Sequence, residues 1–105
     1  LLPNVRITYP APGAVLPLNQ VFSVSGTATL SEPDRFNFYK IEIRPEGDPV
    51  FRNVRLSSAP APNAGTPLAS VDPALFGPGH YQLVLTVVDE TGNFPAPCAI
   101  RITFR

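Results

Sequence analysis

The sequence predicts an all-β domain built as an antiparallel β-sandwich of about seven short strands. Apolar and polar residues alternate along several runs of the chain, which is the period-2 pattern of strands with one buried face. Seven glycines and fourteen prolines supply turn signals between those runs. No segment shows a sustained helical period, so little helix is expected. Parallel strands buried on both faces would give continuous apolar runs, and the alternation therefore favours antiparallel sheets.

The longest alternating run, from Gly79 to Asp89, predicts the central strand. Pro78 precedes this run, and Asp89 begins the turn residues that end it. Either Gly92 or Asn93 is expected to adopt a positive φ in that turn. The side chains expected to face the core are Tyr81, Leu83, Leu85 and Val87.

Six further strands are expected around the central one. They cover residues 5–9, 21–29, 36–44, 50–56 and 68–71 and a last strand that starts at Cys98 or Ala99 and runs to Arg105, with residues 14–16 as a candidate edge piece. Tyr9 and Tyr39 are assigned to the core, and Gly26 inside a strand predicts a bulge or a close backbone approach. Residues 57–67 are rich in Pro, Ala, Ser and Gly and are expected to form a mobile loop. Residues 72–76 are expected to form a turn or a single helical turn.

Length and composition place the chain among single globular domains. A chain of 105 residues is long enough for one core. Its formal net charge is zero and it has no basic run, which argues against nucleic acid as a partner. No apolar run approaches the roughly 20 residues of a membrane-spanning helix, so no membrane insertion is expected. Cys98 is the only cysteine, and no intradomain disulfide can form.

Two motifs resemble bacterial Ig-like and fibronectin type III-like modules. The later motif is Leu75-x-x-x-Gly79-x-Tyr81-x-Leu83-x-Leu85-x-Val87-x-Asp89-x-x-Gly92-Asn93, and the earlier one is Ile7-x-x-Pro10-x-x-Gly13 followed by Phe22-x-Val24-x-Gly26-Thr27-Ala28. In those families the tyrosine sits at a corner of the sandwich, with its hydroxyl bonded to upstream backbone. The chain has neither a cysteine pair nor a tryptophan, which favours the disulfide-free branches.

The resemblance covers nearly the whole chain and implies a function as well as a fold. Similar Ig-like repeats are appended to bacterial envelope proteins, including some penicillin-binding proteins and surface proteins. The chain has no Met and opens with Leu1, so residues 1–105 are expected to be one domain of a longer polypeptide. The resemblance implies a non-catalytic, extracytoplasmic spacer or protein-interaction module. Its expected partners are neighbouring domains of the same polypeptide, another envelope protein or a glycan.

Few residues of the sequence could carry catalysis or bind a metal. His80 is the only histidine, and it is expected at the surface on the face opposite Tyr81. Cys98 is expected to be a small, partly buried apolar residue rather than a nucleophile. One His and one Cys exclude a structural zinc site, and no cofactor motif is present. No enzyme activity is therefore expected.

Calcium is the one metal with candidate ligands. Asp89, Glu90 and Asn93 crowd one loop, and Asp34 or Asp72 could come near them in the fold. The same residues also fit a plain turn in which Asx side chains bond the backbone. Both interpretations stay open from the sequence alone.

An apolar surface is the last candidate site. Phe38, Val84 and Val88 are expected on one outer sheet face, where they would form a small patch suited to packing against another domain. The competing function is a carbohydrate- or ligand-binding, adhesive module that uses phenylalanines in or near loops. Those phenylalanines are Phe36, Phe51 and Phe94.

Overall fold

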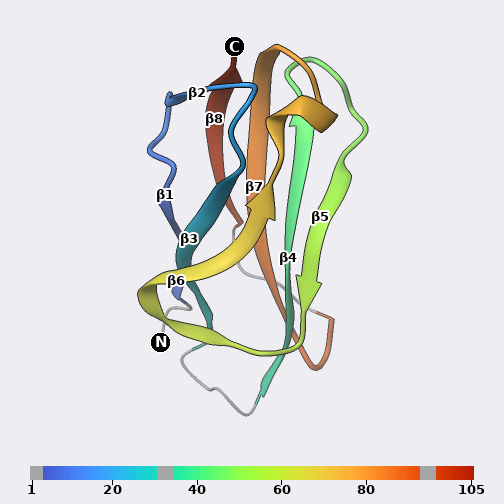
Figure 1. Cartoon of the computed structure of the whole chain (residues 1–105). Helices are drawn as coiled ribbons and strands as arrows, with labels where there is room; N and C mark the ends of the chain where they lie inside the picture. The colour runs from blue at the N-terminus through green and yellow to red at the C-terminus, as the bar shows by residue number, and fades with distance from the viewer. Residues whose placement is uncertain (1–3, 31–34, 93–96) are drawn as a thin grey trace.

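The computed structural model describes residues 4–30, 35–92 and 97–105, and these form an all-β domain of two packed sheets with no disulfide. The described residues contain eight strands and one 3-10 helix (Figure 1). Their bounds are β1 Asn4–Tyr9, β2 Val15–Leu16, β3 Phe22–Thr29, β4 Phe36–Pro45, β5 Arg52–Ser57, β6 Ala61–Val71, η2 Pro73–Leu75, β7 Gly79–Asp89 and β8 Cys98–Phe104.

The strands form a three-stranded sheet, β1-β3-β6, and a five-stranded sheet, β2-β8-β7-β4-β5. β7 occupies the middle of the five-stranded sheet and has the bounds that its alternating pattern predicts. Its four predicted core residues, Tyr81, Leu83, Leu85 and Val87, are all buried. They meet buried side chains of both sheets, including Val24 and Leu68 from the three-stranded sheet and Ile41, Ile43, Ile102 and Phe104 from the five-stranded one.

The prediction of a mobile loop at residues 57–67 is wrong, because β6 runs from Ala61 to Val71. The prolines and glycine of this segment indicate a loop in the sequence. β6 pairs only with β3, so it lies at the edge of its sheet, where a residue without an N–H is tolerated. Pro67 pairs with Ser25 beside a register shift in the β3–β6 ladder.

The expectation of purely antiparallel sheets is also incorrect, because β2 pairs with β8 in parallel. The candidate edge piece at residues 14–16 is present as β2, which brings the strand number to eight. β1 belongs to the three-stranded sheet and β2 to the five-stranded one, so the chain changes sheets between Tyr9 and Val15. A two-residue strand is too short to give a periodic pattern that reveals its partner.

Tyr9 lies on the surface and not in the core. Half of its surface is exposed, whereas Ile7 is buried. The β1–β3 register shifts between these two residues, so the simple alternation that would bury both does not hold at the end of β1. Tyr39, by contrast, is buried as predicted and donates a hydrogen bond to the carbonyl oxygen of Leu68 at 3.0 Å.

Gly26 shows both features that the sequence predicts for it. The β3–β6 register shifts between Gly26 and Ala28, and β1 crosses so close that an added Cβ would collide with the carbonyl oxygen of Arg6. The single helical turn expected at residues 72–76 is also confirmed. It is η2, capped by the Asp72 side chain, which accepts from the N–H of Ala74 at 3.1 Å.

The molecule is elongated, measuring 40 × 27 × 19 Å along its principal axes. β1 begins at the lower end of the sandwich and β8 finishes at the upper end, so the chain enters and leaves at opposite ends (Figure 1). Among the described residues, no helix has the length and apolar character needed to cross a membrane.

Candidate functional site

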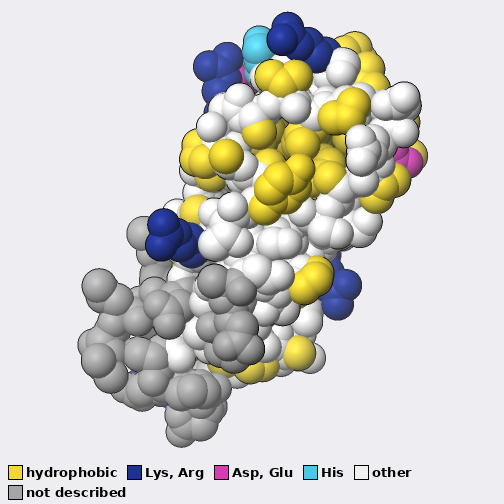
Figure 2. Space-filling view, turned by 60° about the vertical axis from the view of Figure 1, so that its left-hand side comes forward, with side chains coloured by type: hydrophobic (Ala, Val, Ile, Leu, Met, Phe, Trp, Pro, Cys, Tyr) yellow, Lys and Arg dark blue, Asp and Glu magenta, His cyan; other side chains and the backbone are white. Residues whose placement is uncertain are grey.

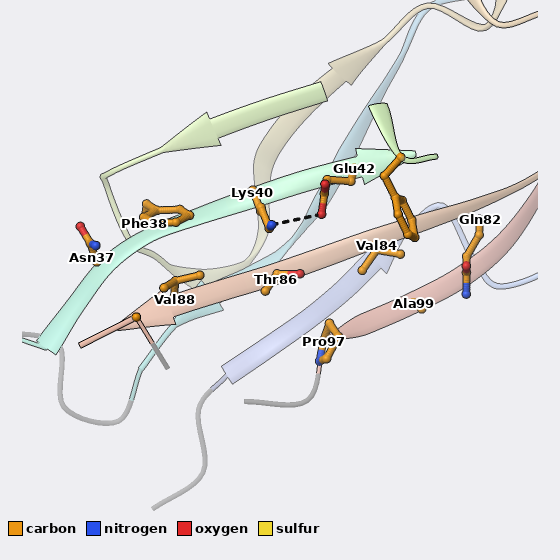
Figure 3. A pocket seen from close by; sticks show the side chains of 12 residues that line it. Asn37, Phe38, Lys40, Glu42, Gln82, Val84, Thr86, Val88, Pro97 and Ala99 are labelled. Atoms are coloured by element: carbon orange, nitrogen blue, oxygen red, sulfur yellow. Dashed lines mark ion pairs between the residues drawn. The ribbon is translucent and has the colours of Figure 1, made fainter. Parts of the chain in front are cut away.

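The outer face of the five-stranded sheet carries a groove of about 690 Å³. Outward-facing side chains of β4, β7 and β8 form its floor, as seen in Figure 3. We call this feature the outer groove. Its apolar lining residues are Phe38, Phe51, Val84, Val88, Pro97 and Ala99. The predicted surface residues Phe38, Val84 and Val88 therefore lie together in one concave surface.

Strand register explains why these side chains meet. Phe38 of β4 lies directly opposite Val88 of β7, and Val84 of β7 lies opposite Ala99 of β8. Side chains of directly opposed residues on one sheet face contact each other. Phe51 comes from the segment before β5, and the Arg44 guanidinium lies 4.9 Å from the centre of its ring. This cation–π contact holds Phe51 at the groove wall.

The outer face of β7 is more buried than its alternating pattern predicts. The exposed fractions of Val84, Thr86 and Val88 are 8%, 6% and 8%. Longer side chains from the neighbouring strand, such as Phe38 and Lys40, flank the floor and shield it from water. The central strand is thus nearly covered on both faces, although no further layer of the described chain lies on the outer one.

The middle of the outer groove holds an ion pair. Lys40 Nζ lies 3.4 Å from Glu42 Oε1, and both side chains are partly buried (Figure 3). A pair so close to solvent contributes at most about 1 kcal/mol to stability. Its main effect is to neutralise the groove, because each charge cancels the other.

A second hollow of about 400 Å³ continues the outer groove toward the start of β7. The two share Gln82 and Ala99 as lining residues. Arg44, Gln82 and Arg101 form a row across β4, β7 and β8 because they are paired in register. We call this second feature the cationic hollow, since two arginines and one carboxylate line it.

Hydrogen bonds hold both arginines of the cationic hollow in place. Arg44 donates through Nε to Gln82 Oε1 and through Nη1 to the Asp48 carbonyl oxygen, both at 2.8 Å. Arg101 Nε lies 2.7 Å from Glu46 Oε2. A guanidinium has three nitrogens, and a fixed guanidinium can still present a free terminal nitrogen to an anion. No sequence pattern predicts this row, because its three members are far apart along the chain.

The edge of the five-stranded sheet is less suited to binding. β5 lies at this edge, and its ladder with β4 has a register shift between Ile41 and Glu42. Arg52 and Arg55 lie opposite the core residues Ile43 and Ile41, so two cations stand at inward-facing positions of the edge strand. A bulge and inward charges are both devices that oppose the addition of another strand.

The two potential catalytic residues lie apart. His80 is exposed on the outer face, with Nδ1 2.8 Å from Thr103 Oγ1. Cys98 is partly buried, packs against the core, and accepts a hydrogen bond from the Ile7 N–H at 3.4 Å. Cys98 is opposite Leu85 on β7, five residues beyond His80, which corresponds to about 17 Å along the strand.

The calcium candidates lie in and beside the turn after β7. Asp89 Oδ1 accepts hydrogen bonds from the N–H and the hydroxyl of Thr91, at 2.9 and 2.6 Å. Glu90 forms an ion pair with Arg35, and Asn93 lies outside the described residues. Within the described segments, no three His, Cys, Asp or Glu side chains are grouped closely enough to hold a metal ion. Gly92 has φ +86°, one of the two positions where a positive φ is expected.

The corner tyrosine makes the backbone contact that the resemblance implies. The Tyr81 hydroxyl lies 2.5 Å from the Phe76 carbonyl oxygen and 3.1 Å from that of Gly77. The ring is buried against Phe104, with the two ring centroids 4.8 Å apart. Tyr81 therefore ties the segment after η2 to the start of β7.

The other aromatic candidates divide between core and surface. Phe36 is partly buried against the core, Phe51 lines the outer groove, and Phe94 lies outside the described residues. Tyr9, Val15 and Val21 are large apolar residues that are exposed elsewhere than in the two hollows. Figure 2, which brings the β1 side forward, shows hydrophobic side chains gathered over its upper half.

No protein-family model matches the chain, and no curated protein matches it either. The structure itself shows an all-β domain of two packed sheets in a chain of 105 residues.

Proposed function

We propose that the chain is a non-catalytic, Ig-like accessory module that acts as a spacer and protein-interaction domain in a larger extracytoplasmic bacterial protein. The observation that carries this proposal is that β1 begins and β8 ends at opposite ends of an elongated sandwich. A polypeptide that passes through such a domain therefore has its flanking segments separated along the 40 Å long axis of the sandwich. Its broad sheet faces stay free for lateral contacts.

The Ig-like or fibronectin type III-like assignment is supported by strand order. β1-β3-β6 and β8-β7-β4 correspond to the A-B-E and G-F-C strands of such sandwiches, with β5 beside β4. β7 then corresponds to strand F, near whose start the corner tyrosine of those folds lies. Tyr81 occupies that place and makes the upstream backbone contact.

The separation of His80 and Cys98 supports a non-catalytic role. A Cys–His pair needs its side chains within hydrogen-bond reach, about 3 Å. The two residues stand about 17 Å apart along β7. If the longer polypeptide has an activity that can be assayed, His80→Ala and Cys98→Ala should leave it unchanged.

A domain-exchange experiment tests the spacer role. In the longer polypeptide, residues 1–105 are deleted or replaced by an unrelated rigid domain of about the same 40 Å length, which the chain also enters and leaves at opposite ends. Loss of function on deletion and recovery on replacement are expected of a spacer. Failure of the replacement to restore function would show that the surface of this domain is needed.

A ligand-binding module is the second candidate. The outer groove favours it, because concave, mostly apolar hollows of about 300–1,000 Å³ with a few polar groups are typical binding sites. Titration with soluble glycans, followed by NMR, tests the carbohydrate form of this function. Changes in the resonances of Phe38 and Phe51 would support carbohydrate binding, and unchanged spectra would favour the spacer role.

A further inference from the structure

We propose that the outer groove and the cationic hollow together bind an amphipathic α-helix of a partner protein. The apolar face of the helix lies on Phe38, Phe51 and Ala99, above the floor formed by Val84 and Val88. Its acidic C-terminal turn lies at Arg44 and Arg101. The inference rests on the proposed interaction function and specifies its partner.

The lining of the outer groove requires a largely apolar occupant. The apolar residues Phe38, Phe51, Val84, Val88, Pro97 and Ala99 line it, and Lys40 and Glu42 cancel each other's charge at 3.4 Å. The lining also includes the polar side chains of Asn37, Lys40, Glu42, Gln82 and Thr86. Over the six apolar residues, however, the hydroxyl groups of a densely hydroxylated glycan would lose water without gaining a partner, which is costly. Apolar side chains lose no hydrogen bonds to water, and their burial is favourable.

The floor of the groove favours a helix over an extended peptide. β7 lies between β4 and β8, so the backbone groups of the central strand are used by the two ladders on either side. An extended peptide on this floor would find few backbone partners for its own N–H and C=O groups. An α-helix satisfies those groups internally and presents only side chains.

The dimensions of the surface fit a helix. From Phe38 to Arg44 the outer face runs for six residue steps of β4, about 20 Å. A helix of about 13 residues has this length at 1.5 Å per residue. The strands β5, β4, β7 and β8 lie side by side in this order and span three inter-strand spacings, about 14 Å. A helix with its side chains is about 10–12 Å wide.

Charge sets the direction of the helix. The cationic hollow places Arg44 and Arg101 at one end of the apolar floor, with Glu46 as the only carboxylate lining it among the described residues. Glu46 offsets the charge of Arg101, so the hollow has one net positive charge. Both guanidiniums are already fixed, by Gln82, the Asp48 carbonyl and Glu46. A helix C-terminus carries partial negative charge from its free carbonyls, and nearby cations stabilise it. An acidic last turn adds charge-assisted hydrogen bonds to the guanidiniums.

A pair of synthetic peptides tests the proposal. Each has about 14 residues, Leu at helical i, i+3, i+4 and i+7 spacing, an Ala and Gln background and an amidated C-terminus. One has two Glu in its last turn and the other has two Gln, so the pair differs only in charge. Fluorescence anisotropy with the full chain should show the Glu peptide binding about tenfold more tightly.

Surface variants assign the binding to this face. Arg101→Gln changes an exposed residue and should remove most of the difference between the Glu and Gln peptides. Ala99→Glu also changes an exposed residue and places a charge on the wall shared by both hollows, so both peptides should bind at least about tenfold more weakly. Leu75→Ser is the matched control, because Leu75 is 73% exposed and lines neither hollow.

Several outcomes would overturn the proposal. Equal affinity of the Glu and Gln peptides would remove the role of Arg44 and Arg101, and binding that survives Ala99→Glu would place the helix elsewhere. A dimer seen by sedimentation without peptide, and lost in Ala99→Glu, would assign the face to a second copy of the chain. None of these results bears on the domain exchange, so the spacer role and the helix site can fail separately.

Discussion

The Tyr81 hydroxyl makes one contact that joins two elements. It bonds the carbonyl groups that follow η2, while its ring packs on Phe104 inside the core. Removing the hydroxyl leaves a backbone carbonyl in a partly buried place without its donor. Such a hydrogen bond stabilises the fold mainly because a desolvated carbonyl group without a donor is costly.

Tyr81→Phe is therefore expected to lower the free energy of unfolding by about 1 kcal/mol. Urea denaturation, followed by circular dichroism, measures the change. Tyr9→Phe is the matched control, since Tyr9 is half exposed and its loss should change stability very little. Equal effects of the two substitutions would contradict the role given to the Tyr81 hydroxyl.

Gly26→Ala tests the close approach of β1 to β3. The new Cβ would collide with the Arg6 carbonyl oxygen, and a backbone atom inside a paired strand cannot move aside without disturbing the ladder. We expect a loss of about 3 kcal/mol in unfolding free energy, the upper end for overpacking. Ser23→Ala, at an exposed position of the same strand, should be nearly neutral. A small effect of Gly26→Ala would show that β1 can separate from β3 at little cost.

Among the elements, the strands whose apolar and polar residues alternate strictly could be predicted from the sequence. β7 has the expected bounds, and β4 and β8 differ from their expected ranges by at most one residue. β6 could not be predicted, because edge pairing tolerates prolines that otherwise indicate a loop. β5 begins two residues later than expected, which leaves Phe51 outside the strand and against the outer groove.

The candidate site was only partly predictable for a related reason. Alternation places Phe38, Val84 and Val88 on one face, and the structure puts them in one groove. Pairing register between distant strands determines what else lies beside them. The row of Arg44, Gln82 and Arg101 depends on two ladders at once, and single-strand periodicity carries no information about either.

The β5 edge yields a prediction about association. Arg55 is exposed on the edge strand, at a position opposite the core residue Ile41. Arg55→Val removes a charge that opposes strand addition and gives the edge a strand-forming residue. Light scattering should then show concentration-dependent association, whereas Arg55→Glu keeps a charge and should stay monomeric. Monomeric behaviour of both variants would mean that the bulge alone protects this edge.

At the scale of the whole molecule, the lateral surfaces and the two ends have different uses. The outer groove lies on a broad face of the 40 Å long sandwich, whereas neighbouring domains in a polypeptide would attach at its ends. A partner of the groove can therefore bind without displacing the neighbours. The proposed spacer role and the proposed helix site are therefore compatible in one module.

The parallel pairing of β2 with β8 determines how the domain responds to a pulling force. Beside the paired residues, backbone hydrogen bonds run from Gly13 N–H to Arg101, from Thr103 N–H to Ala14 and from Arg105 N–H to Leu16. β2 is near the start of the chain and β8 at its end, so tension applied to the two ends slides one strand along the other. The force then acts on these hydrogen bonds at the same time, and they do not break one after another. Single-molecule stretching should show a lower rupture force for Arg105→Pro, which removes one donor at an exposed residue, with little change in denaturant stability.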